Sequence, residues 1–316
     1  MTRPTAWKPA RDTWHKVACP LCGGEQFETL ATTDRYDMDL VTAGCLRCGL
    51  VMTNPQPDDH ALDEFYRDHY RHYYQKTDTP SLAYIREFRK DERAATTAQF
   101  LRDAGLVFPG AAVLDIGASE GCILKAIADL EPTTRRVAVE PNLTFGEFAV
   151  TYAGCSLHAS VQALQAAGSA AFDLVIMNHV YEHVGHPVRF LAGLTALLTP
   201  AGQIYIDVPD VTEYEGLESL HIAHLYHFGP DTLARAAALA EFRVVRIEKH
   251  QPVMHPKSLR SVLRPGTATT PAPHNMRQGW DRVRQANRHA WHYHRSRWSL
   301  PRRLVHRWLA GATHTA

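Results

Sequence analysis

Four of the six cysteines fall into two pairs with the spacing of metal ligands. The pairs are Cys19 with Cys22 and Cys45 with Cys48. Two Cys-x-x-Cys turns can place four thiolates at the corners of a tetrahedron around Zn²⁺. Four cysteine ligands leave no open position, so we predict a structural zinc ion. An iron–sulfur cluster is the alternative metal centre, and four unrelated buried thiols are the alternative without a metal.

Histidines gather in two short segments and could act as proton acceptors. His179 and His183 lie in residues 178–184, and the second segment, 220–228, holds His221, His224 and His227. Imidazole titrates near neutrality, which suits a general base. We expect His224 to be the base.

The alternates to His224 are His183, His221 and Tyr226. A purely structural role, with imidazoles that cap helices and stack on aromatic rings, is equally compatible with the pattern. A metal ion bound by His221, His224, Glu182 and His183 is a third possibility.

Residues 113–124 have the sequence of a strand, a glycine-bearing turn and the start of a helix. Gly117 lets the backbone pass close to a ligand, and Gly121 would let the helix pack on the strand. Asp115, at the carboxyl end of the strand, can accept a hydrogen bond from an amino group. Such a turn also binds dinucleotides, so by itself it indicates only a nucleotide-like ligand.

A second acidic residue narrows the ligand. Glu140 ends the next β-branched run, and a carboxylate at this place can accept from both hydroxyls of a ribose. The spacing from Asp115 to Glu140 corresponds to one strand-helix-strand unit. On spacing alone, NAD remains possible.

Residues 109–250 alternate short apolar strands with helical patterns, which predicts a parallel sheet covered on both faces. The expected fold class is α/β, a doubly wound Rossmann-like sheet. The expected strands are 112–116, 136–139, 172–177, 203–208 and 242–249. The expected helices are 122–129, 145–152, 161–165, 187–198 and 230–240.

Four runs in this region, DIGASEG, VAVEPN, FDLVIMNHVYEHV and LTPAGQIYIDVP, occur in the order seen in class I S-adenosylmethionine (SAM)-dependent methyltransferases, which the chain resembles. The resemblance implies SAM as cofactor and a seven-stranded sheet that ends in an antiparallel hairpin. It implies that residues near Gly117 face the methionine part, Glu140 the ribose, and Asn178–His179 the sulfonium side. Ser160 stands where such enzymes often carry an Asp near the adenine. The expected cofactor-binding residues are Asp115, Gly117, Ala118, Gly121, Glu140, Pro141, Ser160, Asn178 and His179.

The whole chain then divides into four expected segments. Residues 1–57 form a zinc-binding module, 58–108 a helical linker or lid, 109–250 the SAM-dependent methyltransferase domain, and 251–316 a basic helical extension. A cysteine-pair module before a SAM domain resembles bacterial sugar and secondary-metabolite methyltransferases, including deoxysugar C-methyltransferases. That resemblance implies methylation of an oxygen or carbon of a sugar, nucleotide- or lipid-linked, or of a natural product. RNA methylation and a non-catalytic SAM-fold scaffold are the alternatives.

Two features depart from the C-methyltransferase pattern. Those enzymes carry a Tyr-His-Glu-His segment, of which this sequence keeps only the last histidine, His224, in His-Ile-Ala-His. They also carry a C-terminal α/β domain, where this chain has a short basic tail. An O-methyltransferase with a histidine base therefore fits at least as well.

The tail concentrates positive charge. Residues 251–316 hold twelve Lys and Arg against Asp281, a net charge of +11 that leaves −10 for the first 250 residues. Arginines from Arg277 to Arg307 alternate with tryptophans, which suits a sugar nucleotide, an anionic lipid surface, RNA, or docking on the acidic body. The acidic body argues against RNA. No run of eighteen apolar residues or signal-peptide pattern occurs, so we expect a cytoplasmic protein, with possible contact to the inner membrane face.

Overall fold

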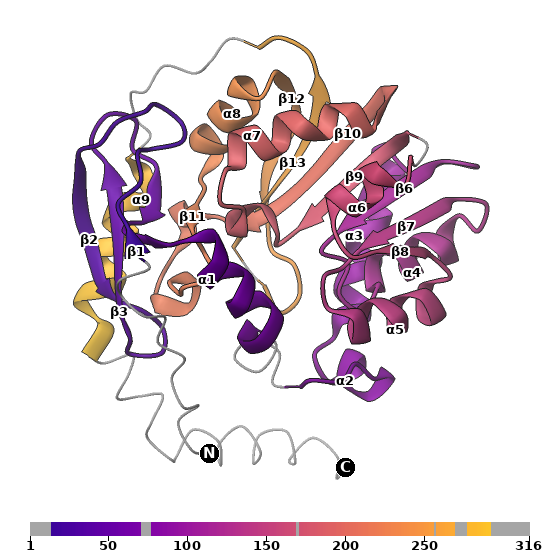
Figure 1. The fold of residues 1–316 in the computed structure, drawn as a ribbon, viewed down its shortest axis with the longest axis horizontal. Coiled ribbons are helices and arrows are strands. Elements are labelled where there is room, and N and C mark those ends of the chain that lie inside the picture. Colours follow the sequence, from indigo (N-terminus) through magenta and orange to yellow (C-terminus); the bar gives the residue numbers. More distant parts are fainter. Residues whose placement is uncertain (1–13, 71–76, 169–170, 256, 269–276, 292–316) are drawn as a thin grey trace, which may run out of the picture.

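A seven-stranded sheet forms the centre of the molecule (Figure 1). The computed structural model describes residues 14–70, 77–168, 171–255, 257–268 and 277–291. Across the sheet the strands are β12 (Phe242–His250), β13 (Ser258–Pro265), β10 (Leu198–Pro209), β9 (Phe172–Asn178), β6 (Ala112–Ile116), β7 (Arg135–Val139) and β8 (Ser156–His158).

Helices cover both faces of this sheet because its central strands are apolar on both sides. In β6 every residue is buried; Leu114 joins one core cluster, and its neighbour Val113 joins the other. The first cluster includes α6 (Val161–Ala166), α7 (Pro187–Gly193) and α8 (Pro230–Leu239). The second includes α3 (Lys90–Asp103), α4 (Cys122–Leu130) and α5 (Leu143–Ala153). The structure thus confirms the expected doubly wound α/β fold.

The last two strands form an antiparallel hairpin. β13 runs antiparallel to both β10 and β12, whereas β10, β9, β6, β7 and β8 pair in parallel. The resemblance implied this hairpin. β13 comes after residue 250, where the sequence analysis ended the domain, so the sheet continues into the segment expected to be a helical extension.

The N-terminal residues form a second, smaller sheet with an unexpected member. Its strands, in order, are β11 (Tyr226–His227), β4 (Val51–Thr53), β3 (Asp39–Cys45) and β2 (Phe27–Thr33). β11 comes from the histidine-rich segment, some 170 residues away in the chain. A short ribbon of β1 (Trp14–His15) and β5 (Gln56–Pro57) lies beside it. The small sheet is therefore tied directly to the histidine segment.

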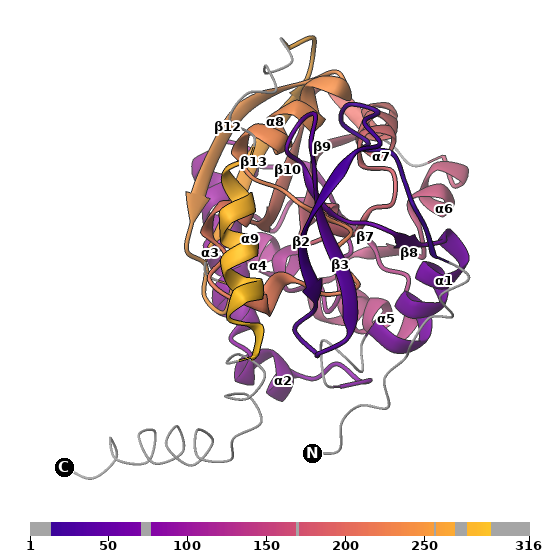
Figure 2. The ribbon, with the colours of Figure 1, turned by 90° about the vertical axis from the view of Figure 1, so that its left-hand side faces the viewer.

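One helix of the basic tail lies along the small sheet. In both views α9 (Gln278–Arg288) runs beside β2 (Figures 1 and 2). Trp280 is buried over Gly44, where an added Cβ would lie 2.3 Å from the indole, and its Nε1 donates to the carbonyl of Gly49 (2.8 Å). Arg284 pairs with Glu28 of β2. This part of the tail docks on the body, as one of the expected alternatives stated.

Two expected helical regions are interrupted or shorter in the structure. Within the segment expected to be a helical linker or lid (58–108), the chain is broken between α2 (Leu82–Glu87) and α3, because Arg89 adopts a left-handed conformation with φ of 48°. α7 ends at Gly193 and continues only as a 3-10 turn, Leu194–Leu197, because Leu198 already pairs in β10.

The remaining helices are short. α1 (Asp59–Glu64) is capped by Asp58 and runs into a π-helical turn, Phe65–His69. Further 3-10 turns lie at Tyr181–His183, Val211–Glu213 and Leu217–Ser219. Among the described residues, no helix has both the length and the apolar composition that crossing a membrane requires.

Candidate functional site

The glycine turn after β6 lies against the segment that follows β9. Gly117 has φ of +73°, a conformation that favours glycine, and an added Cβ would lie 2.6 Å from Cγ2 of Val180. The amides of Gly117 and Ala118 both donate to the carbonyl of Val139. The turn is thereby held between β7 and residues 178–183, and its backbone has no room for a side chain at Gly117.

Gly121 has a different role from the one expected. It takes φ of +76° at the start of α4, and an added Cβ would lie 2.8 Å from Cβ of Ala149. Ala149 belongs to α5, so Gly121 allows α4 to pack against a neighbouring helix rather than against β6. The sequence could not show this, because the partner lies 28 residues further along the chain.

Two buried carboxylates lie at the carboxyl ends of β6 and β7. Glu140 accepts hydrogen bonds from the amides of Ser119 and Asn142, at 2.9 Å each. Burial, with a smaller contribution from the charge of Glu140, raises the pKa of Asp115 to about 8. A protonated Asp115 can donate a hydrogen bond as well as accept one, and both carboxyl groups lie next to the glycine turn.

The other residues expected to bind the cofactor border the same edge of the sheet. Ser160 caps α6, with its Oγ accepting from the amide of Ala163 (3.0 Å). Pro141 is exposed beside Glu140. Asn178 ends β9, and its buried Oδ1 has no hydrogen-bond partner. A buried amide oxygen without a partner costs free energy unless a ligand satisfies it.

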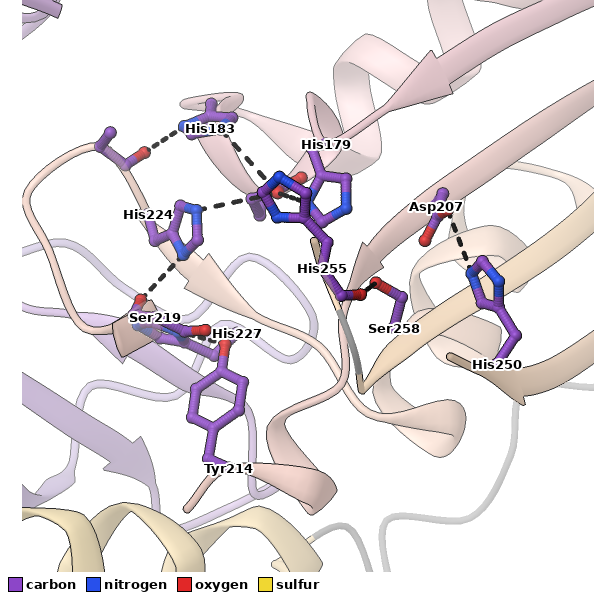
Figure 3. Close-up of polar contacts among 12 residues, drawn as sticks. His179, His183, Asp207, Tyr214, Ser219, His224, His227, His250, His255 and Ser258 are labelled. Carbon is purple, nitrogen blue, oxygen red and sulfur yellow. Dashed lines mark hydrogen bonds and ion pairs between the residues drawn. The ribbon is translucent and has the colours of Figure 1, made fainter. Parts of the chain in front are cut away.

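The carboxylate of Glu182 is the centre of the histidine cluster, and its side chain is 1% exposed. Its Oε1 lies 3.4 Å from Nδ1 of His179, 3.8 Å from Nε2 of His183 and 3.8 Å from Nε2 of His224. Figure 3 shows these three imidazoles converging from two segments of the chain, one with His179 and His183 and the other with His224. The structure therefore brings together the two histidine groups that the sequence kept apart.

Backbone carbonyls fix which nitrogen carries the proton in two of these rings. Nδ1 of His183 lies 2.6 Å from the carbonyl of Ala223, and Nδ1 of His224 lies 2.8 Å from that of Ser219. A carbonyl can only accept, so both Nδ1 atoms donate, and in neutral rings both Nε2 atoms carry lone pairs. Burial lowers the pKa of His183 and of His224, which favours the neutral rings.

The two other residues expected to assist catalysis lie at different distances from this centre. The ring of His221 packs on that of His224, with 3.7 Å between centroids. Burial also lowers its pKa. The hydroxyl of Tyr226 donates to the carbonyl of Gly185 (2.8 Å), and burial raises the pKa of this phenol to about 12. In the described structure this hydroxyl is thus engaged with backbone rather than with Glu182.

N-terminal residues form one wall of the cluster, which the sequence did not indicate. The hydroxyl of Tyr66 lies 3.1 Å from Nδ1 of His183 and donates to the carbonyl of Ala223. Thr53 of β4 donates to the carbonyl of His224 through its hydroxyl. In sequence, Tyr66 was only an apolar position of a helix, and nothing local marks a tyrosine whose partner lies 117 residues away.

The four paired cysteines converge at one end of the small sheet. Cys19 and Cys48 have their sulfurs 3.4 Å apart, those of Cys22 and Cys45 are 3.5 Å apart, and all four lie within 4.8 Å of one another. Gly23 and Gly49 take left-handed conformations, with φ of 67° and 80°. These glycines let the turns fold back on the cysteines. The arrangement is compatible with a tetrahedral zinc site, where zinc–sulfur distances are about 2.3 Å.

The basic tail is only partly described. Arg277 donates to the carbonyl of Leu46, and Trp291 is 61% exposed. Arg282 and Arg288 belong to α9. The tail residues expected to bind an anionic partner from position 292 onward, which include Arg295, Arg297, Arg302, Arg303 and Arg307, lie outside the described residues.

Comparison with known proteins agrees with this fold. Residues 85–264, more than half of the chain, match the methyltransferase domain family. A ubiquinone biosynthesis O-methyltransferase of Caulobacter vibrioides is 31% identical over 131 residues, which are 40% of this chain and 49% of that protein. One from Parvibaculum lavamentivorans matches to the same extent. The chain spans about half the length of the curated relatives it matches.

Solved structures show the same fold at low sequence identity. The 1,6-didemethyltoxoflavin-N1-methyltransferase of Burkholderia thailandensis is 22% identical, with a TM-score of 0.51 over 70% of this chain and 97% of that one. A plantazolicin methyltransferase is 14% identical, with a TM-score of 0.52 over 65% and 94%. The chain belongs to the methyltransferase domain family, and its fold is that of the class I SAM-dependent methyltransferases.

Proposed function

We propose that this protein transfers a methyl group from SAM to an oxygen or carbon of a small molecule, a sugar or a secondary metabolite. The observation that carries the proposal is the contact between Gly117 and Val180. Because Val180 lies between His179 and Glu182, the glycine turn and the histidine cluster are two sides of one site. A cofactor at the turn and an acceptor at the cluster would therefore be neighbours.

The residues around the turn suit SAM. The turn provides close backbone approach at Gly117, and Glu140 is a buried carboxylate at the position from which a ribose is bound in this fold. The unpartnered amide oxygen of Asn178 can accept from a bound ligand. Bound there, SAM supplies an electrophilic methyl carbon: the acceptor atom forms the new bond to that carbon as the carbon–sulfur bond breaks, which leaves S-adenosylhomocysteine.

The histidine cluster would help the acceptor to lose its proton. The Nε2 atoms of His183 and His224 carry lone pairs and lie on the Glu182 side of their rings. His221 packs behind His224 and would hold its ring in place. Tyr226 would act on the acceptor only if its hydroxyl left the carbonyl of Gly185.

Two observations support a small acceptor. Tyr66 and Thr53 of β4 place N-terminal residues against one side of the cluster, which favours an acceptor of limited size. The ubiquinone biosynthesis relatives are O-methyltransferases by name, and a structural neighbour is an N1-methyltransferase with a toxoflavin precursor bound. Both names favour a small-molecule acceptor, and the first favours an oxygen acceptor.

The cysteine cluster would hold a structural zinc ion. Cys19, Cys22, Cys45 and Cys48 leave no place for a substrate on such an ion, and Cys45 ends β3, which pairs with β4 next to β11. We therefore propose residues 1–57 as a zinc-binding module that shapes the acceptor side. The following segments would be a helical lid (58–108), the methyltransferase domain (109–250, with β13 added) and a basic extension.

Calorimetric titration with SAM and with S-adenosylhomocysteine, followed by an assay of S-adenosylhomocysteine formation over a panel of sugars and phenols, tests this function. Wild-type protein should bind both cofactor forms and turn over at least one acceptor class. His224→Gln should lose most turnover with SAM affinity kept, whereas His186→Gln, an exposed histidine of the same loop as Glu182, should behave as wild type. Binding of neither cofactor form would indicate a scaffold, and full turnover by His224→Gln would remove that residue from the mechanism.

A further inference from the structure

The surroundings of the Glu182 carboxylate are unusual for a charged group. Its side chain is 1% exposed, and neither Oε1 nor Oε2 has a hydrogen-bond partner. Burial of an unpaired carboxylate costs several kcal/mol or more, on the order of the penalties seen for isolated charges in proteins. A positive charge should therefore lie next to this carboxylate when the protein is at work.

Two of the three imidazoles around Glu182, those of His183 and His224, do not provide that charge in their neutral state. The Nδ1 atoms of His183 and His224 donate to backbone carbonyls, so the Nε2 atoms that face Glu182 present lone pairs. Three acceptors, one oxygen and two nitrogens, then point toward the same place. Such an arrangement is unfavourable when empty and favourable around a cation.

The distances and the outer contacts are those of a metal site. Oε1 of Glu182 lies 3.8 Å from each Nε2, and all three donor atoms lie within 4.8 Å of one another. Two ligands at about 2.1 Å from one zinc ion are at most about 4.2 Å apart, so each oxygen–nitrogen pair can share an ion. Metal-binding histidines usually donate their second nitrogen to a carbonyl or carboxylate, as both rings do here.

We propose that Glu182, His183 and His224 bind a divalent transition-metal ion through Oε1 and the two Nε2 atoms. Two imidazoles and one carboxylate are the donor set of catalytic zinc sites and leave coordination positions open. Nδ1 of His179, 3.4 Å from Oε1, can bind as a fourth donor or receive a proton at the edge of the site. This cation site is separate from the cysteine cluster.

The ion would explain how the cluster assists methyl transfer, and this part of the inference rests on the proposed function. A hydroxyl group that binds the ion becomes more acidic, because the cation stabilises the oxyanion. Its proton would leave to His179 or to water, and the oxygen would then form the new bond to the methyl carbon. The site would favour acceptors that present a hydroxyl group, with a second oxygen beside it as a further ligand.

The competing occupant of this place is a proton. One protonated imidazole would give Glu182 an ion-pair partner without any metal. A metal ion can be told apart from a proton by its spectrum. A metal ion titrated into the protein binds with a defined stoichiometry and has an absorption spectrum of its own, which a proton does not have.

The experiment is a titration of the full chain, purified with zinc at the cysteines, with Co²⁺ followed by visible absorption and by calorimetry. We expect one equivalent of Co²⁺ to bind with ligand-field bands and without a thiolate charge-transfer band. Glu182→Gln and His224→Gln should each weaken this binding by about 10- to 100-fold or abolish it, the order of loss seen when metal sites are perturbed. The control His186→Gln, an exposed histidine nearby, should bind Co²⁺ as the wild type does.

The outcomes separate this inference from the proposed function. Absence of Co²⁺ binding, or equal binding by wild type and Glu182→Gln, would overturn the metal site even if the enzyme methylates an acceptor. Binding lost in Glu182→Gln but present in a protein that transfers no methyl group would keep the site and overturn the function. SAM affinity and the far-ultraviolet circular dichroism of each variant show that a loss of Co²⁺ binding does not reflect unfolding.

Discussion

The cofactor turn and the histidine cluster lie side by side but are built in opposite ways. The turn and its two carboxylates come from one strand-helix-strand unit, so that Asp115, Gly117 and Glu140 are within 26 residues of one another. The cluster is assembled from three distant places, Tyr66, the segment 179–183 and His224. The first depends on local geometry, and the second depends on the small N-terminal sheet being in position.

This difference predicts that substitution of the paired cysteines should disturb the histidine cluster but not the cofactor turn. Cys19→Ser combined with Cys48→Ser should remove tightly bound zinc, whose binding contributes roughly 10–16 kcal/mol to folding in isolated zinc-finger peptides. The small sheet that ends in β11 should then loosen, and methyl transfer should be lost. Metal analysis, hydrogen exchange of residues 27–53 and an assay of S-adenosylhomocysteine formation measure the three effects.

The cofactor turn should remain functional in that double variant, with SAM affinity within about a factor of three of wild type. Cys122→Ser, a cysteine outside the cluster, serves as the control and should keep its zinc. Loss of SAM binding together with zinc would show that the two regions are one cooperative unit and would break the comparison.

The contact of α9 with the small sheet allows a milder perturbation of that sheet, on which the histidine cluster depends. Trp280→Ala should lower the free energy of unfolding by about 3–5 kcal/mol, because it empties a fully buried indole site over Gly44. Chemical denaturation gives the value, and hydrogen exchange should show the loss in β2 and β3 first. Trp291→Ala, at a side chain that is 61% exposed, should change stability by about 0.5 kcal/mol or less.

At the turn itself, the addition of a single methyl group should weaken cofactor binding and leave the zinc site unchanged. Gly117→Ala brings Cβ to within 2.6 Å of Val180 and imposes left-handed strain of about 1–2 kcal/mol. We expect SAM affinity to fall about tenfold or more, with zinc content unchanged. Gly110→Ala carries the same strain at φ of +77° but has no heavy atom within 4 Å of Cβ, so calorimetry should show normal SAM affinity.

A further prediction concerns the pH dependence of stability. The pKa of Asp115 is raised from 3.8 to about 8 by burial, so the folded, cofactor-free protein binds a proton that the unfolded chain releases. Its favourable contribution is complete below about pH 4 and is lost as pH rises to about 8. Asp115→Asn cannot titrate, so its stability relative to wild type should increase across this range.

Urea denaturation at several pH values measures this difference. Asp129→Asn, on the exposed side of α4, is the matched carboxyl-to-amide control. An Asp115→Asn curve parallel to that of wild type would mean that the carboxyl group is ionised in the folded protein.

The predictions made from the sequence for individual residues and strands follow the same division between local geometry and distant contacts. β6 matched its expected bounds. Gly117 has no room for a side chain beside Val180, and its close approach to a ligand stays a prediction. Gly121 was paired with the wrong element, because its partner Ala149 is on another helix. β8 and β13 were implied only by the resemblance to a seven-stranded sheet, and β11, which is two residues long, was not expected at all.

By itself, the sequence determined the alternating strands and helices, the cofactor turn and the two cysteine pairs. Each of these depends on spacing within a few residues or on burial that repeats with the period of one element. The tertiary structure decided that β11 joins the N-terminal sheet, that α9 docks on β2, and that Glu182 meets three histidines. These contacts bring residues far apart in the chain together through the packing of whole sheets, which no local pattern encodes.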